Sequence, residues 1–405
     1  MSIDLYKNNY AALTAKQLRL LTELLEQACQ ALELSKAMRQ RAEDSYKAVG
    51  KWLAESEDPL FDDVEIYPQG SQRIGTTNKP PFRAEFDLDF ICYLPKAEGI
   101  HPDVCRAMVI ERLKEHGTYK DLVTELNRGC RINYADNFHM DITPGIPDQN
   151  HANEFGAISV PDKKLKEWKA SNPKGYARDF DQIAELVPAY SDDDESLFAM
   201  AALEARSIEE LPKHQGFKGI LRRSVQIMKQ HRDLLFHENK EYDGKAPISI
   251  ILTTLASRAY RDAIKNRVYG NELEVLLAVV ESMTSYIETK YVDGKIEIWV
   301  TNPKNEHENF AEKWNVDPKR IEAFHYWHRN IIGKLEELAS VKSIHLIREK
   351  LNQLIGESAS EAAVDKHFES LNEERSNNNL FVAKTGAIST AVTSTPVKSN
   401  TFFGK

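Results

Sequence analysis

The chain has 405 residues, of which 41% are hydrophobic and 28% charged, and its formal net charge at pH 7 is −9. This composition is typical of a folded protein with enough chain to bury a large core. The acidic surplus disfavours a protein that coats duplex nucleic acid, because such binding needs many Lys and Arg contacts with phosphates. The sequence has no run of about 18 apolar residues, and its opening stretch MSIDLYKNNY does not resemble a signal peptide. We therefore expect a cytoplasmic protein without a membrane span.

The first 60 residues carry a helical pattern. Apolar residues recur at intervals of three and four from Leu21 to Leu53, and no proline occurs before Pro59. Thr14 and Gln17 have the spacing of a capping box, which would begin the helix. The pattern predicts either one long helix or a pair of helices within residues 1–60.

The next region has the two-residue period of β-strands. Val64 and Ile66 alternate with acidic residues, and apolar side chains alternate over residues 86–93. Residues 130–134 and 138–143 are separated by a short polar turn, which predicts a hairpin. We expect a mixed sheet within residues 61–195.

Beyond about residue 195 the period is helical again. The predicted helical stretches are residues 197–205, 220–236, 248–263, 272–290 and 318–351. After residue 375 the chain is rich in Ser, Thr, Asn and Gly, so burial of apolar surface cannot offset the entropy of ordering it. The sequence thus predicts an α+β protein with a helical domain over residues 196–375 and a flexible tail over residues 376–405.

Two aspartates stand in a predicted strand. Side chains two positions apart share one face of a strand, so Asp87 and Asp89 project together while their apolar neighbours pack behind them. The same alternation places Asp141 on a neighbouring strand, with Met140 and Ile142 in the core. Three such carboxylates can hold two Mg²⁺ ions, or Mn²⁺ in their place, for an in-line phosphoryl displacement. Taken alone, an acidic pair with this spacing is more typical of a solvated sheet face.

A Gly-Ser turn lies shortly before these aspartates. Gln69, Gly70 and Ser71 directly follow a predicted strand and precede a possible helix start. Backbone N–H groups and a hydroxyl in that position can bind the phosphates of a nucleoside triphosphate. A plain β-turn with an N-capping serine is the alternative, but the nearby aspartates favour a phosphate site.

The motifs, in this order, resemble those of a known superfamily. The run GSQRIGTT, followed by EFDLDF and HMDI, resembles the Gly-Ser, D-x-D and third-Asp signature of the DNA polymerase β-like nucleotidyltransferases. Within that superfamily the chain is most similar to the bacterial cGAS/DncV-like enzymes, or CD-NTases, and the segments EWKASNPKGYARDF and NPKNEHENFAEKW extend the resemblance. The resemblance implies a polymerase β-like catalytic core with a mixed sheet over residues 61–195, joined through an N-terminal spine helix to the helical domain.

The resemblance also implies roles for single residues. Asp87 and Asp89 would hold both Mg²⁺ ions, while Asp141 would complete one metal site and help to deprotonate the attacking ribose hydroxyl. The groups that would bind the triphosphate are Gln69, Gly70, Ser71, Lys229 and Ser249. The pattern alone also fits a solvated helix position for Lys229 and a helix cap for Ser249.

The implied activity is the template-independent joining of nucleoside triphosphates. The substrates would be ATP with GTP or another nucleoside triphosphate, and the product a cyclic di- or trinucleotide second messenger of bacterial anti-phage defence (CBASS). Three alternatives remain: a linear oligoadenylate synthase, an RNA nucleotidyltransferase and a non-catalytic nucleotide sensor. The negative charge disfavours an RNA substrate, and the presence of all three aspartates disfavours a sensor. The family further suggests a partner, a ubiquitin-transfer-like protein that would act on the C-terminal tail.

Overall fold

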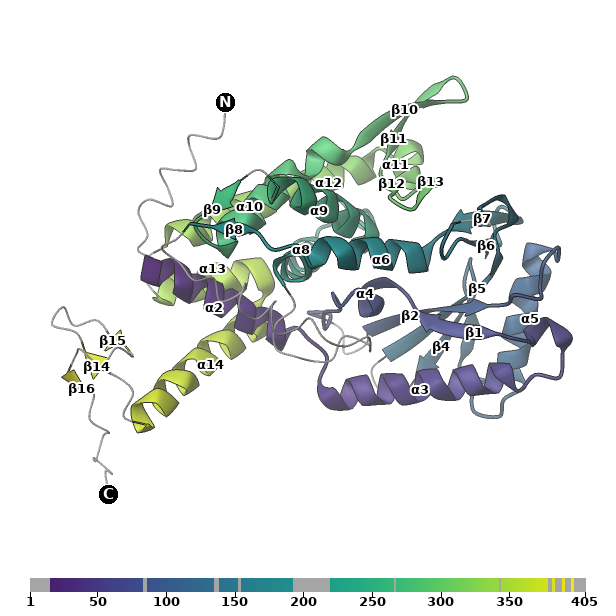
Figure 1. The fold of residues 1–405 in the computed structure, drawn as a ribbon, viewed down its shortest axis with the longest axis horizontal. Coiled ribbons are helices and arrows are strands. Elements are labelled where there is room, and N and C mark those ends of the chain that lie inside the picture. Colours follow the sequence, from purple (N-terminus) through teal and green to yellow (C-terminus); the bar gives the residue numbers. More distant parts are fainter. Residues whose placement is uncertain are drawn as a thin grey trace.

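A computed structural model shows a sheet on one side of the molecule and a group of helices on the other (Figure 1). It describes residues 15–82, 86–134, 138–151, 154–191, 219–265, 267–341 and 344–377, with three two-residue pieces further on. No helix in these ranges is long and apolar enough to cross a membrane.

The N-terminal region forms a pair of helices, one of the two forms expected. Helix α2 (Ala15–Ala31) packs in the helical half of the molecule, and α3 (Lys36–Ala54) lies along the sheet (Figure 1). Ser35 caps α3, because its hydroxyl accepts a hydrogen bond from the backbone N–H of Met38 at 3.2 Å. Thr14, the expected capping residue of the first helix, lies outside the described residues.

The sheet has seven strands and is mixed, as expected. Its main path runs β1-β2-β5-β4-β3, with β6 paired to β5 and to β7. The strands are β1 (Glu65–Pro68), β2 (Phe86–Tyr93), β3 (Val123–Glu125), β4 (Cys130–Tyr134), β5 (Phe138–Pro147), β6 (Ile158–Asp162) and β7 (Glu167–Ser171). Strands β2 and β5 are parallel, whereas the other pairs in this sheet are antiparallel. The predicted hairpin is the pair β4–β5.

One face of the sheet is covered by α3 and α5 (Pro102–Lys114). The apolar residues of the central strands point into this layer, and Leu88, Phe90, Met140 and Ile142 are fully buried there. The aspartates between them therefore lie on the opposite face, which is directed towards the helical half.

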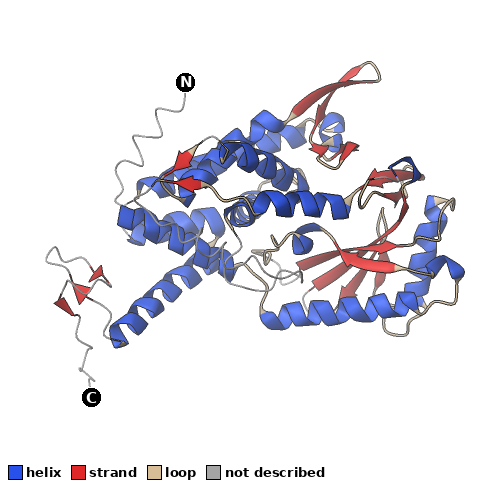
Figure 2. Cartoon of the chain, viewed as in Figure 1, coloured by secondary structure: helices blue, strands red, loops and turns tan. Residues whose placement is uncertain are grey.

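Most of the remaining described chain is helical (Figure 2). The helices are α6 (Pro173–Ala184), α8 (Ile220–Phe236), α9 (Ser249–Ala263), α10 (Glu272–Ser282), α11 (Glu312–Val316), α12 (Lys319–Ser340), α13 (Ile344–Ile355) and α14 (Glu357–Ser376). They share one hydrophobic cluster with α2. The predicted stretch 197–205 lies outside the described residues.

The expected helix over residues 272–290 is wrong in its second part. Helix α10 ends at Ser282, a short 3-10 helix (Met283–Tyr286) follows, and the chain then enters the hairpin β10 (Glu288–Val292) and β11 (Lys295–Trp299). Asp293 and Gly294 form its turn, both with positive φ, which is the turn chemistry of a two-residue hairpin. Two further short strands follow, β12 (Thr301–Asn302) and β13 (Asn305–Asn309).

Two other expectations concern the C-terminal part. The helix expected over residues 318–351 is divided, because α12 ends at Ser340 and α13 begins at Ile344. In the expected tail, Phe381–Val382 pairs with Ile388–Ser389 and with Thr395–Pro396, and most other residues lie outside the described ones. The flexible tail remains a prediction.

A buried histidine makes the stability of the helical half depend on pH. His231 on α8 is 2% exposed, and its Nε2 lies 3.0 Å from the side-chain oxygen of Asn330 on α12. Burial lowers the pKa of His231 to about 4. Its ordinary pKa is about 6.5, so between these values the unfolded chain binds a proton that the folded chain does not. The stability from neutral His231 is therefore complete above pH 6.5 and is lost as the pH falls towards 4.

We expect His231→Gln to reduce this acid sensitivity. Between pH 7.5 and 4.5, the wild-type protein should lose up to about 2 kcal/mol more unfolding free energy than the variant. Urea unfolding at the two pH values measures the difference, and contributions from other titrating groups cancel because both proteins contain them. Equal losses in the two proteins would show that folding does not lower the pKa of His231.

Candidate active site

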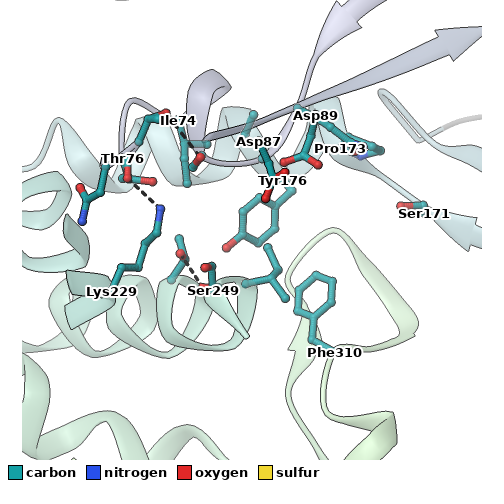
Figure 3. A pocket seen from close by; sticks show the side chains of 18 of the residues that line it. Ile74, Thr76, Asp87, Asp89, Ser171, Pro173, Tyr176, Lys229, Ser249 and Phe310 are labelled. Carbon is teal, nitrogen blue, oxygen red and sulfur yellow. Dashed lines mark hydrogen bonds between the residues drawn. The ribbon is translucent and has the colours of Figure 1, made fainter. Parts of the chain in front are cut away.

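The parallel pairing of β2 and β5 brings the three predicted aspartates together. Asp89 is the register partner of Asp141, and Asp87 precedes Asp89 by two positions on the same face. Asp87 is exposed, whereas Asp89 and Asp141 are half-buried. Figure 3 shows Asp87 and Asp89 side by side at the edge of a cavity. The predicted cluster is therefore present as a group of carboxylates on one face of the sheet.

When all three carboxylates are ionised, their negative charges repel one another. Burial, followed by the charges of Asp141 and Asp87, raises the pKa of Asp89 to about 6, and the charges of Lys229 and Arg131 act in the opposite direction. A cluster of this kind favours cations. Hard oxygen ligands on two rigid strands also match the chemistry of Mg²⁺.

Arg131 on β4 is a site residue that sequence reasoning did not identify. It is the register partner of Asp141 across the hairpin. Its Nε and Nη2 donate to the two carboxylate oxygens of Asp141 at 2.6 and 2.9 Å, and Nη2 lies 3.0 Å from Asp87 Oδ1. In this conformation, no group of three His, Cys, Asp or Glu side chains within the described ranges is arranged to hold a metal ion. The metal-binding roles of the aspartates thus remain predictions, supported by their chemistry and by their common face.

The Gly-Ser turn has the predicted strand–turn–helix form. Strand β1 ends at Pro68, and the single-turn helix α4 (Gly70–Arg73) follows. The N–H of Gln69 donates to the carbonyl of Asp89 at 2.8 Å, which fixes the turn beside the aspartates. Gly70 has a φ of +61°, and a Cβ at this position would lie 2.7 Å from Asp89 Oδ2. Only glycine fits here without strain or a clash.

We expect Gly70→Ala to impair the site beyond its effect on stability. Gly99 provides a matched control, because it also has a positive φ (+76°), but a Cβ added there would meet no atom within 4 Å. Each alanine should cost about 1 kcal/mol of unfolding free energy through backbone strain. Only Gly70→Ala should also lower nucleotide turnover, by about tenfold or more, because it displaces Asp89. Equal turnover in the two variants would contradict this account.

Two residues of the helical half lie at the predicted phosphate site. Lys229 on α8 is only 8% exposed, and its Nζ donates to the carbonyl of Thr76 at 2.9 Å. Ser249 is the first residue of α9, and its hydroxyl accepts from Arg232 Nη1 at 2.9 Å. The burial of Lys229 shows that the alternative of a solvated helix position is wrong. The alternative of a capping role for Ser249 is also wrong, since Ile248 is the N-cap of α9. Both residues line a cavity of about 460 Å³ together with Gln69, Gly70, Ser71, Asp87 and Asp89.

The other end of the cavity has a different character. Its lining includes the rings of Tyr176 and Phe310, which meet edge to face at a centroid distance of 5.9 Å (Figure 3). Asn302 Nδ2 donates to Glu308 Oε2 at 2.8 Å, and burial raises the pKa of the Glu308 carboxyl above its ordinary value. Aromatic rings beside a half-buried carboxylate and a buried amide are suited to a nucleobase. The segment around Glu308 extends the family resemblance, but no residue in it was predicted to belong to the site.

Comparisons with known proteins agree with this geometry. Residues 21–183 match the Second Messenger Oligonucleotide or Dinucleotide Synthetase domain. A c-di-GMP synthase of Roseivirga ehrenbergii is 32% identical over 393 residues, which are 95% of this chain and 97% of the relative. The chain belongs to this family of synthetases. The resemblance inferred from the motifs is confirmed, and the protein is a nucleotidyltransferase of the CD-NTase group.

Solved structures show the same fold. The CD-NTase CdnG of Bradyrhizobium diazoefficiens, in complex with GTP, has a TM-score of 0.66 at 18% identity and covers 86% of this chain and 99% of its own. CdnC of E. coli MS115-1 with ATP has a TM-score of 0.57 at 13% identity and covers 83% and 98%, respectively. The expected polymerase β-like α+β fold is thereby confirmed.

Proposed function

We propose that this protein joins guanine nucleotides into a cyclic dinucleotide and releases pyrophosphate. The observation that carries the proposal is a single cavity that is lined by Asp87 and Asp89, by the Gly-Ser turn with Lys229, and by the rings of Tyr176 and Phe310 beside Glu308. The name of the Roseivirga relative, a c-di-GMP synthase, supports the same product class. The expected use of ATP as a substrate becomes the alternative.

The phosphate end would position the triphosphate for attack. Ser71 supplies a hydroxyl, and the buried Lys229 supplies a positive charge whose position is fixed by its bond to Thr76. Ser249 lies across the cavity at the start of α9. Fixed charges and dipoles of this kind stabilise the charge that develops on the phosphoryl group without reorganisation of solvent.

The aspartates would hold two Mg²⁺ ions, and Asp141 would help to take the proton of the attacking ribose hydroxyl. When bound, such ions neutralise phosphate charge and acidify the attacking hydroxyl. The chain contributes the orientation, because Asp87 and Asp89 are fixed by β2 and Asp141 by the parallel strand β5. Carboxylates held on paired strands suit this task better than carboxylates on loops.

We expect Asp87→Asn to abolish turnover while the fold persists. The substitution removes one carboxylate charge from the site, and the rate of dinucleotide formation should fall more than about 100-fold. Asp121→Asn provides a control, because Asp121 is exposed just before the edge strand β3. Products from labelled nucleoside triphosphates are measured by mass spectrometry after nuclease P1 digestion, which separates cyclic from linear products.

The outcomes also separate the competing functions. A linear product would favour an oligoadenylate-type synthase. Nucleotide binding that needs no metal, with no turnover in the wild-type protein, would favour a sensor and would contradict the proposed reaction.

The base end favours guanine on chemical grounds. The Watson–Crick edge of guanine presents two adjacent donors, N1–H and the exocyclic amino group, which one ionised carboxylate can accept together. Adenine presents an unprotonated N1 there, which a carboxylate repels. The Asn302 amide holds one oxygen of Glu308, and the rings of Phe310 and Tyr176 are available to contact the base.

Glu308→Gln should therefore weaken the use of GTP. An amide loses one acceptor and presents a donor to N1–H, so kcat/KM for GTP should fall about 10- to 100-fold, with little change for ATP. Glu306→Gln is the matched control, because Glu306 lies two positions away on β13 but is exposed. Product formation is compared with GTP alone, ATP alone and both. Unchanged use of GTP by Glu308→Gln would show that another group selects the base.

We further propose, from family membership alone, a signalling role in bacterial anti-phage defence and a cytoplasmic location. Conjugation of the C-terminal tail by a ubiquitin-transfer-like protein belongs to the same group of proposals. A different kind of partner is known for one structural neighbour, because CdnC of E. coli MS115-1 forms a complex with HORMA-deltaN.

A further inference from the structure

The guanidinium of Arg131 contacts two members of the aspartate cluster. It makes a two-point contact with both oxygens of Asp141, at 2.6 and 2.9 Å, and a third contact with Asp87 at 3.0 Å. The geometry follows from the backbone, because Arg131 and Asp141 are register partners in the antiparallel pair β4–β5. Planar guanidinium–carboxylate pairs of this kind are among the strongest polar contacts in proteins.

The contact answers an electrostatic problem that the fold creates. Register pairing places Asp89 beside Asp141, with Asp87 two positions away, so three negative charges gather on one face. Without a cation they repel one another, which would destabilise the folded sheet. Arg131 contacts two of the three, and the third, Asp89, lies against Gly70 of the Gly-Ser turn.

A divalent metal ion would need the same carboxylate oxygens. Arg131 donates hydrogen bonds to both carboxylate oxygens of Asp141. A metal ion bound to the same oxygens would lie close to the guanidinium, and the two positive charges would repel each other. Arg131 therefore occupies carboxylate oxygens that a metal ion at this cluster would use.

We propose that Arg131 is a built-in counter-ion that holds Asp141 and Asp87 in the metal-free enzyme, and that metal binding displaces its guanidinium from Asp141. The inference rests on the proposed function in one respect, namely that the aspartates are the metal ligands. Arg131 thus preserves the shape of the site before metal and substrate arrive, and it lowers the metal affinity of the empty site. It acts as a positioning residue for the aspartates.

The test measures metal binding and stability separately from turnover. Binding of Mn²⁺ without nucleotide is followed by electron paramagnetic resonance, and thermal unfolding is followed in EDTA and in Mg²⁺. For Arg131→Gln we expect Mn²⁺ to bind about tenfold more tightly than in the wild-type protein. We also expect a melting temperature lower by about 3–6 °C in EDTA, with most of the loss recovered in Mg²⁺.

Two further variants serve as controls. Arg131→Lys retains the charge without the two-point contact and should give intermediate values of both quantities, even if the glutamine variant is poorly folded. Lys163→Gln also removes one positive charge, but from an exposed pair with Glu125, and should change neither quantity.

The results distinguish this inference from the proposed function. If Arg131→Gln melts earlier in EDTA but binds Mn²⁺ no more tightly, Arg131 is only a structural ion-pair partner and the inference is overturned. If Asp89→Asn binds Mn²⁺ as well as the wild-type protein does, the aspartates are not the metal ligands and the proposed reaction itself fails.

Discussion

The parallel pairing of β2 with β5 is the constraint on which the site depends. It sets Asp89 beside Asp141, and the alternation along each strand then fixes every other side chain in the cluster. A shift of one residue would turn Asp141 into the core and expose Met140 and Ile142. Both of these apolar residues are fully buried, so packing of the hydrophobic layer maintains the register that the chemistry needs.

The same pairing concentrates negative charge, and neighbouring elements supply the compensation. Arg131 comes from β4, and Lys229 comes from α8 in the other half of the molecule. Helix α8 also holds the loop after the Gly-Ser turn, because Arg222 Nε donates to the carbonyl of Ile74 at 3.0 Å and Gln226 Nε2 to that of Thr77 at 3.2 Å. Hydrogen bonds from the helical half therefore fix this loop, while the sheet fixes the turn itself.

The sequence predicts those parts of the site that depend on neighbouring residues in the chain. Strand alternation and a glycine turn are short-range features, so Asp87, Asp89, Asp141 and Gly70 could be placed from the sequence alone. The orientation of Lys229 could not be predicted, because the pattern of a single helix does not show which other elements will pack against each of its faces. Arg131 was accessible in principle: positions 131 and 141 are equidistant from the centre of the predicted hairpin turn, so antiparallel pairing makes them neighbours.

The base end was missed for a different reason. Asn302 and Glu308 lie on the short strands β12 and β13, in a stretch between the predicted helices 272–290 and 318–351 where the sequence pattern predicted no element. Their position relative to the aspartates depends on long-range contacts. Asn172 provides one, because its side chain caps α6 through Gly175 at 2.8 Å and also donates to the carbonyl of Lys304 at 3.3 Å.

This arrangement separates chemistry from specificity. The aspartates on the sheet can serve any nucleoside triphosphate, because phosphates and ribose hydroxyls are common to all of them. In the proposed function, selection of the base falls instead to residues on β13 and α6, such as Glu308 and Tyr176, which lie outside the paired strands β2 and β5. Substitutions on these elements can therefore change the base that is used while the register of β2 and β5, and with it the reaction, stays intact.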